Sequence, residues 1–222
     1  RTTAIHTVLD TIIEEALKGY QFLILGASGH KHSVYDPFIS EVVKRSPCHV
    51  VLVSGGTQRA EGTSHGEAQP PVEAERRSFK RILVPTNGSY YSDAAFEFAA
   101  LYAASVGARV SVLYISERRQ QNPLLPMAAD GALSEPMQEL MRVTLTQQFG
   151  ERVKDPQQLS CKIRESESGI SGLVEEVNEG NYDLVVLGAE NKSFVERLYL
   201  GQHIEAAFIE VNCAIAVVIP KV

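Results

Sequence analysis

The chain has 222 residues, 44% of them hydrophobic, and its formal net charge is −6 at pH 7. A hydrophobic content this high supports one large core or two small ones, and it excludes disorder for most of the chain. The pI is near 5.6 and the sequence has no long basic run. It therefore lacks the cluster of Lys and Arg residues that usually binds the phosphates of a nucleic acid. We therefore expect a folded protein that does not bind nucleic acid.

Neither a membrane span nor a disulfide framework is expected. No stretch of the sequence approaches the roughly 20 apolar residues that cross a bilayer, and no signal segment opens the chain. The three cysteines, Cys48, Cys161 and Cys213, lie far apart, which is typical of reduced thiols in a cytoplasmic protein. The chain opens at Arg1 in a polar stretch that leads into a helical pattern, and we expect it to belong to a longer protein.

The first part of the chain alternates helices and strands. Apolar residues at helical spacing predict a helix from Leu9 to Leu17, and Gly19 ends it. The pattern then predicts a strand over 22–25, a helix over 38–45 with Asp36 as its cap, and a strand over 49–53. Residues 55–78 are rich in Gly, Ser, Glu and Pro and are expected to be a flexible linker.

The second part continues the same alternation. Strands are predicted over 81–85, 109–115, 159–163, 184–188 and 214–219. The helices between them are predicted over 92–106, up to about 153, over 170–179 and over 195–211, with a long loop from Glu117 to Pro136. Strands that alternate with helices predict an α/β fold with a doubly wound, open parallel sheet of the Rossmann-like type.

An internal repeat divides the chain. Residues 20–27, Tyr-Gln-Phe-Leu-Ile-Leu-Gly-Ala, correspond to residues 182–189, Tyr-Asp-Leu-Val-Val-Leu-Gly-Ala, and a helix precedes each segment. Cys48 and Cys213 open the matching final strands. The sequence thus predicts the C-terminal half of one domain over 1–54 and a complete copy of it over 79–222.

Ligands of open parallel sheets settle beyond the carboxyl ends of the strands. Three segments of the complete copy converge there, namely 85–89, 114–115 and 188–201. These segments and the residues directly beside them provide the candidate residues for binding a cofactor: Pro85, Thr86, Asn87, Tyr114, Ile115, Leu187, Gly188, Asn191, Gly201 and Gln202.

These segments resemble the universal stress protein family. The family's first strand typically ends in Val-Pro-x-Asp-Gly-Ser, and its fourth ends in Gly-x-x-Gly followed nine residues later by Gly-Ser or Gly-Thr. Residues 82–89, Ile-Leu-Val-Pro-Thr-Asn-Gly-Ser, look like the version in the cytosolic tails of cation/proton antiporters, which often carry two copies in tandem. The resemblance implies an adenine-nucleotide-hydrolase-like fold, and it suggests self-association in which the closing strands, 49–53 and 214–219, pair edge to edge.

The resemblance also implies that some members hold ATP on the glycine motif, which is altered here. Asn191 replaces the second glycine, and Gln202 stands in the place of the Ser or Thr hydroxyl that meets phosphate. Asn87 replaces the acid that contacts adenosine in the ATP binders. Lys192 or Arg197 could supply charge. Two interpretations stay open: an adenine nucleotide such as ATP binds here, or Gly188 and Gly201 only shape the loops.

Other chemistries are not supported by the sequence. In the first copy Gly26 and Gly29 fit half of the motif, but Asp36-Pro37 or Ile39-Ser40 stands where its last two residues belong, so we expect no nucleotide there. His30 and His32 lack a third metal ligand, and Ser89 and Ser92 lack a base.

We therefore expect a regulatory module, not an enzyme, that senses an adenine nucleotide. We expect it on the cytosolic face of a membrane, attached to a cation/proton antiporter domain outside these 222 residues. The alternatives are a free-standing stress-response protein and a ligand-free dimerisation or interaction module. A nucleotide hydrolase would need a positioned water and usually a metal, for which no ligands are evident.

Overall fold

The computed structural model describes residues 7–27, 37–54, 78–117, 135–190, 192–194, 197–199 and 202–221. The helices are α1 (Val8–Ala16), α2 (Pro37–Arg45), α3 (Tyr90–Val106), α4 (Glu135–Gly150), α5 (Gly169–Gly180) and α6 (Gln202–Glu210). The strands are β1 (Phe22–Ala27), β2 (His49–Ser54), β3 (Arg81–Thr86), β4 (Arg109–Glu117), β5 (Leu159–Ser166), β6 (Leu184–Gly188), β7 (Lys192–Phe194), β8 (Arg197–Tyr199) and β9 (Ala214–Ile219).

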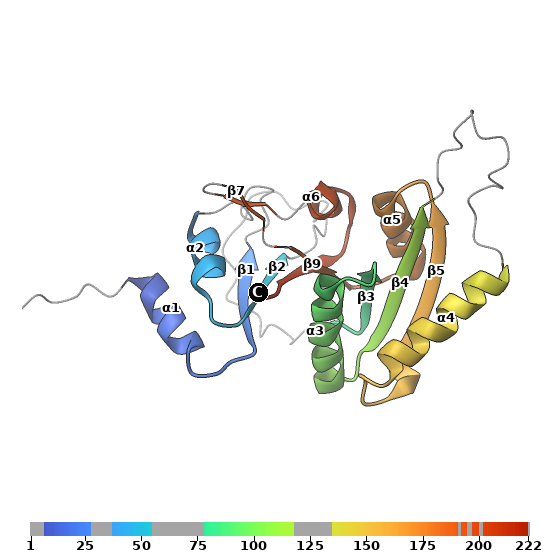
Figure 1. Ribbon diagram of the computed structural model, residues 1–222, viewed down its shortest axis with the longest axis horizontal. Coiled ribbons are helices and arrows are strands. Elements are labelled where there is room, and N and C mark those ends of the chain that lie inside the picture. The colour runs from blue at the N-terminus through green and yellow to red at the C-terminus, as the bar shows by residue number, and fades with distance from the viewer. Residues whose placement is uncertain are drawn as a thin grey trace, which may run out of the picture.

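A single seven-stranded sheet runs through both parts of the chain, in the order β1-β2-β9-β6-β3-β4-β5 (Figure 1). All neighbouring strands in it are parallel except β2 and β9, which pair antiparallel with Val51 opposite Val218. The sheet is therefore open and mostly parallel, as expected, with one antiparallel junction. This junction joins the two predicted closing strands within one chain.

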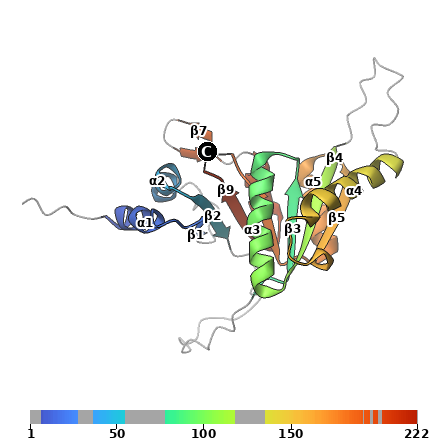
Figure 2. The same cartoon turned by 60° about the horizontal axis from the view of Figure 1, so that its bottom comes forward.

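Helices cover both faces of the sheet, so it is doubly wound. One buried cluster joins α2, α5 and α6 to side chains such as Leu52, Leu83 and Val217. The other joins α3 and α4 to Val51, Val84 and their neighbours on the opposite face. In Figure 2, α3 and α4 lie on the near side of β3, β4 and β5. Because side chains alternate along a strand, neighbouring residues of one strand belong to different clusters.

Local sequence explains where the central helix begins and ends. α3 is rich in alanine and in aromatic residues, and the hydroxyl of Ser89 accepts a hydrogen bond from the Ser92 amide at its first turn. Gly107 ends the helix at φ 67°, a left-handed conformation that favours glycine. β4 follows at Arg109 and pairs with β3. This βαβ unit sets the position of the loop that follows β3.

The structure corrects one predicted element. Residues 192–194 and 197–199 form an antiparallel pair, β7 and β8, with Phe194 opposite Arg197, and the helix begins only at Gln202. The prediction of a helix from 195 was wrong because residues such as Phe194 and Tyr199 favour extended backbone and can form strand pairs. The predicted linker up to residue 77, the Asp36 cap, His30, His32 and most of the predicted 117–136 loop lie outside the described residues.

Candidate functional site

A cavity of about 480 Å³ opens at the carboxyl ends of β3, β4 and β6. The chain leaves β3 toward β4 on one side, and β6 pairs with β3 on the other. This is the point at which strand order reverses, where ligands of such sheets bind. The cavity is lined by Pro85, Thr86, Asn87, Ser89, Tyr91, Ser92, Ile115, Glu117, Gly169, Ile170, Leu173, Leu187, Gly188, Glu190 and Ile204.

The turn after β3 forms one wall of the cavity and is held by its own side chains. The Thr86 hydroxyl accepts from the Gly88 amide at 3.2 Å and donates to the Ser92 hydroxyl at 3.2 Å. The side-chain carbonyl of Asn87 accepts from the Ser89 amide at 3.1 Å. Gly88 has a φ of 74°, which suits glycine. These bonds fix the polar groups of the turn before any ligand arrives.

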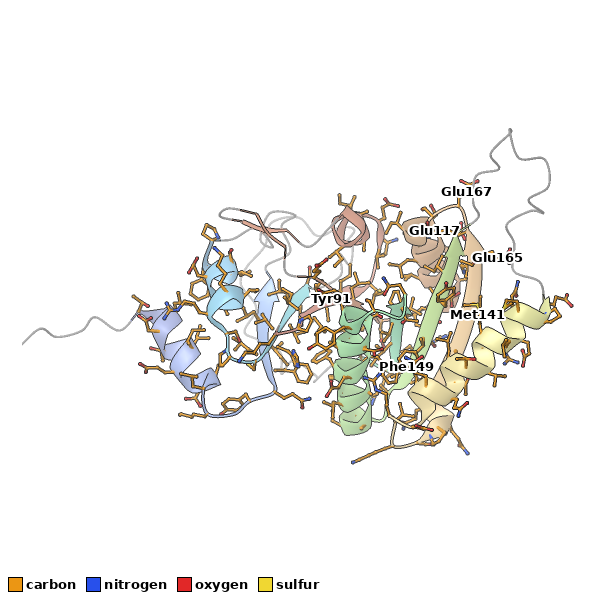
Figure 3. All side chains as sticks on the ribbon, viewed as in Figure 1. Tyr91, Glu117, Met141, Phe149, Glu165 and Glu167 are labelled. Atoms are coloured by element: carbon orange, nitrogen blue, oxygen red, sulfur yellow. The ribbon has the colours of Figure 1, made fainter. Side chains whose placement is uncertain are left out.

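The opposite wall comes from β4 and the first turns of α5. Ile115 packs so closely on α5 that a Cβ added at Gly172 would lie 2.8 Å from its Cγ2 atom. Two residues along β4, Glu117 accepts a hydrogen bond from the Gly169 amide at 2.9 Å, so its carboxylate lies at the N-terminus of α5 (Figure 3). A carboxylate there is stabilised by the helix dipole. Ile170 and Leu173 line the cavity from the same helix.

The end of β6 closes the cavity against α3. A Cβ at Gly188 would lie 2.0 Å from the backbone oxygen of Tyr91 and 2.8 Å from the Ser92 nitrogen. Real side chains never come so close to backbone atoms, so glycine is required here for the strand to pack on the first turn of α3. Gly188 thus has a structural role that does not depend on a ligand.

The candidate residues from the sequence fall into three groups. Pro85, Thr86, Asn87, Ile115, Leu187 and Gly188 all line the cavity. Tyr114 does not: it packs on the opposite face with the α3 and α4 cluster, because it alternates with Ile115 along β4. Asn191 and Gly201 lie outside the described residues, and Gln202 begins α6, although its side chain is not described.

Sequence reasoning missed the wall made by α5, by the first turn of α3 and by α6. The missed lining residues are Tyr91, Ser92, Glu117, Gly169, Ile170, Leu173 and Ile204, whereas Ser89 and Glu190 lie within the predicted segments 85–89 and 188–201 but were not among the candidate residues. The strand alternation that includes Ile115 also predicts Glu117 on the same face, which was an available signal. The sequence of α5 and α6 contains no such signal, because only the crossover connections of the fold bring these helices to this edge of the sheet.

The charges on the described walls are acidic. Glu117 and Glu190 are the ionisable lining residues apart from Tyr91, and the described lining includes no Lys, Arg or His. Apolar side chains provide much of the remaining surface, from Ile115, Ile170, Leu173, Leu187 and Ile204. The cavity therefore has an apolar surface, hydroxyl and amide groups that hydrogen bonds hold in place, and carboxylates that accept hydrogen bonds.

A second cavity, of about 410 Å³, lies where the two parts of the chain meet. It is lined by Val43, Lys44, Ser46, Cys48, Val50, Tyr91, Glu190, Ile219, Pro220 and Lys221. Tyr91 and Glu190 line both cavities. In Figure 3, Tyr91 lies at the end of α3 that faces β2 and β9. A ligand that moves Tyr91 would therefore also change the second cavity, which residues of the first part of the chain line.

Catalytic arrangements are not evident in the described part of the chain. No group of three or more His, Cys, Asp or Glu side chains there could hold a metal ion. The hydroxyl of Ser92 donates to the Ser89 carbonyl at 2.8 Å, and that of Ser89 caps α3, so both serve the turn. Among the helices that the structure describes, none is long and apolar enough to cross a membrane.

Comparisons with known proteins point to one family. Residues 78–218 match the model of the universal stress protein family. A universal stress protein of Methanocaldococcus jannaschii is 27% identical over 143 residues, which cover 63% of this chain and 82% of that protein.

Two solved structures resemble almost the whole chain in fold. A universal stress protein from Archaeoglobus fulgidus has a TM-score of 0.54 and 16% identity, covering 94% of this chain and 66% of that one. A protein of unknown function from Pseudomonas aeruginosa has a TM-score of 0.52 and 16% identity, covering 97% of this chain and 69% of that one. Both solved chains therefore contain polypeptide beyond the part that this chain matches.

Proposed function

Because the chain belongs to the universal stress protein family, we propose that it is a regulatory module that binds an adenine nucleoside or nucleotide. The observation that carries the proposal is the cavity of about 480 Å³ at the β3–β6 edge. It lies within the size range of small-molecule sites, and it combines apolar walls with a few fixed polar groups. The predicted segments after β3, β4 and β6 all contribute to it.

The two kinds of wall suit the two parts of a nucleoside. A flat base fits against apolar side chains such as Ile115, Ile170 and Leu173. Ribose hydroxyls and the amino group of adenine are donors, and the carboxylates of Glu117 and Glu190 are acceptors. Binding would regulate only if the ligand prefers one of two arrangements of the protein. Tyr91, which lines both cavities, is the side chain through which we expect that preference to act.

We propose a cation/proton antiporter as the setting, on the cytosolic face of the membrane. The support is the resemblance of residues 82–89 to antiporter tails and the internal repeat, with the first copy incomplete. A free-standing stress-response protein is the alternative. In neither case do we propose that the module is an enzyme.

A second candidate is a ligand-free interaction module. The packing of Gly188 on Tyr91 favours it, because that glycine is explained without a ligand. Ligand titration separates the two candidates directly.

The test is calorimetric titration of the whole chain with adenosine and AMP. The blocking variant is Ile170→Trp, which fills the cavity from the first turn of α5. Its matched control is Ile209→Trp, at a residue of α6 that is 61% exposed and does not line the cavity. The proposal expects saturable binding that Ile170→Trp abolishes and Ile209→Trp preserves. Binding that survives Ile170→Trp, or no binding at all, contradicts it.

A further inference from the structure

We propose that the edge of β1 binds a strand and a helix equivalent to β3 and α3, from polypeptide outside these 222 residues. The strand adds to the sheet parallel to β1, and the helix covers the face of β1 that carries Ile24. The support is a comparison of equivalent positions, which have a covering element in the complete copy and none among the described residues of the first copy. This inference is independent of nucleotide binding.

The order of the strands identifies the edge. In the complete copy, β6 pairs with β9 on one side and with β3 on the other, parallel and with Leu83 opposite Val185. In the first copy, β1 is equivalent to β6 and pairs with β2, which is equivalent to β9. On its other side, β1 ends the order of the described strands (Figure 1). An edge strand can accept a further strand through its backbone groups, and the place to be filled is the one that β3 takes beside β6.

One face of β1 lacks the helix that covers β6. Val186 of β6 is fully buried in the cluster beneath α3. Its equivalent Ile24 is 57% exposed. Phe22, which shares a face of β1 with Ile24, packs on Phe98 of α3 with the ring centroids 5.4 Å apart. The helix of the complete copy thus contacts the start of β1 and leaves Ile24 exposed, so a further helix could bury apolar surface there.

A glycine marks the place where that helix would pack. At Gly188 a Cβ would lie 2.0 Å from the backbone oxygen of Tyr91, so glycine is required for α3 to pack on the end of β6. Gly26 is the equivalent residue, and no atom of the described residues lies within 4 Å of a Cβ there. Its φ is not in the left-handed region, so its backbone does not require glycine either. A helix that packs on β1 as α3 packs on β6 would explain the glycine at this position.

An aromatic ring indicates the first residue of the joining strand. In the complete copy Tyr182 is buried and donates to Glu176 at 2.8 Å. The guanidinium carbon of Arg81, the first residue of β3, lies 5.9 Å from the centre of that ring. The first copy has the same pair, because Tyr20 donates to Glu15 at 3.1 Å, but Tyr20 is 55% exposed. A cation over an aromatic ring is favourable, so the joining strand should begin with Arg or Lys.

The rest of the joining unit follows from the complete copy. Residues 82–84 of β3 are fully buried, because helices cover both faces of the sheet, so the joining strand should be apolar after its first residue. Glu15 adds no further requirement for charge, because Lys18 already pairs with it at 2.5 Å. The expected partner is therefore a basic residue, an apolar strand and a helix in that order, which is the chemistry of residues 81–106.

The experiment adds a synthetic peptide of residues 78–106, which contains β3 and α3, to the whole chain with labelled Ile, Leu and Val methyl groups. We expect saturable shifts of the methyl signals of Leu23, Ile24 and Leu25 in β1. The signals of Val185 and Val186 in β6 should not shift, because the β3 of the chain itself already occupies that side.

Variants test the two parts of the proposed chemistry. The change Arg81→Glu in the peptide should weaken binding about tenfold, because the cation over Tyr20 is lost. The change Ile24→Lys in the chain should weaken binding by at least as much, because a charge on the covered face opposes docking. Its matched control is Ile209→Lys, at a residue of α6 that is 61% exposed, and it should leave the affinity unchanged.

The contrary outcomes are distinct. Unshifted signals of β1 at the highest peptide concentration would overturn the proposal. Shifts at Val185 and Val186 alone would also overturn it, since the peptide would then exchange with the β3 of the chain itself. If the chain alone sediments as a dimer that Ile24→Lys dissociates, a second copy occupies the edge and the proposed partner is wrong. Equal binding of the Arg81→Glu peptide would overturn the requirement for a basic residue.

Discussion

The α-carbon of Gly188 lies so close to Tyr91 that a Cβ there would fall 2.0 Å from the Tyr91 backbone oxygen. We predict that Gly188→Ala destabilises the chain by about 3 kcal/mol, because the strand and the helix would have to separate. Gly26, the equivalent glycine of the first copy, has no atom of the described residues within 4 Å of such a Cβ. Gly26→Ala should therefore change the free energy of unfolding by less than about 0.5 kcal/mol in urea denaturation. Equal costs at the two glycines would contradict this account.

The two copies of the repeat also differ at an equivalent pair of apolar residues. Ile24 in β1 and Val186 in β6 are equivalent in the repeat, but Ile24 is 57% exposed and Val186 is fully buried. We predict that Val186→Ala costs about 2 kcal/mol of unfolding free energy and Ile24→Ala costs less than about 0.5. The physical reason is that β6 lies between β9 and β3, with Val186 in the buried cluster under α3, whereas β1 is at one end of the order of the described strands. A large cost at Ile24 would mean that its side of β1 is covered.

A buried carboxylate supports the packing of α5. Glu176, whose side chain is 5% exposed, accepts from Lys162 at 2.6 Å, from Arg164 at 2.9 Å and from the Tyr182 hydroxyl at 2.8 Å. Burial alone would raise the pKa of Glu176, but these hydrogen bonds hold it below its ordinary value of 4.5. Glu176→Gln should lower the unfolding free energy by about 1–3 kcal/mol at pH 7.

The pH dependence of this effect has a definite sign. A carboxyl with a lowered folded pKa stabilises the fold fully above its unfolded pKa, and the stabilisation is lost as the pH falls through the folded pKa. The difference between the unmodified chain and Glu176→Gln should therefore shrink below pH 4.5. Urea denaturation over a pH series measures it, with exposed Glu139→Gln as the control. A difference that grows in acid would refute this role.

The thiol of Cys213 should be unreactive in the folded chain. Burial raises its pKa to about 11, and the nearby charge of Asp183 adds to the shift. Since the thiolate is the nucleophile, iodoacetamide at pH 7.5 should modify Cys213 slowly until urea unfolds the chain. Peptide mass spectrometry measures the rate at each cysteine. Rapid modification in the folded state would contradict the raised pKa of this partly buried thiol.

Much of the fold could be predicted because its signals are local. Apolar runs and helical spacing identified the strands of the main sheet, and the repeat indicated that β1 and β2 match β6 and β9. Family resemblance suggested that the closing strands pair edge to edge, but no local pattern specifies which distant strands meet, and the antiparallel direction of the β2–β9 pair was not predicted. The β7–β8 pair was missed because three-residue strands leave too little periodicity to detect.

The candidate site was predicted in part for the same reason. Residues at strand ends, such as Thr86 and Leu187, could be placed from the order of elements alone. Tyr114 was grouped with Ile115, although alternation along β4 sends the two side chains to opposite faces. Ile170 and Ile204 reach the cavity only through tertiary packing, which the spacing of residues in a sequence does not encode.

The central claim is that adenosine binds in the cavity at the β3–β6 edge, and methyl NMR tests it most directly. In the whole chain, the methyl signals of Ile115, Leu173, Leu187 and Ile204 report on the cavity, while those of Val112 and Leu145 report on the opposite face. We predict that added adenosine shifts the first group in a saturable manner and leaves the second unchanged. Unshifted cavity methyls at saturating adenosine, or shifts confined to the opposite face, would contradict the account.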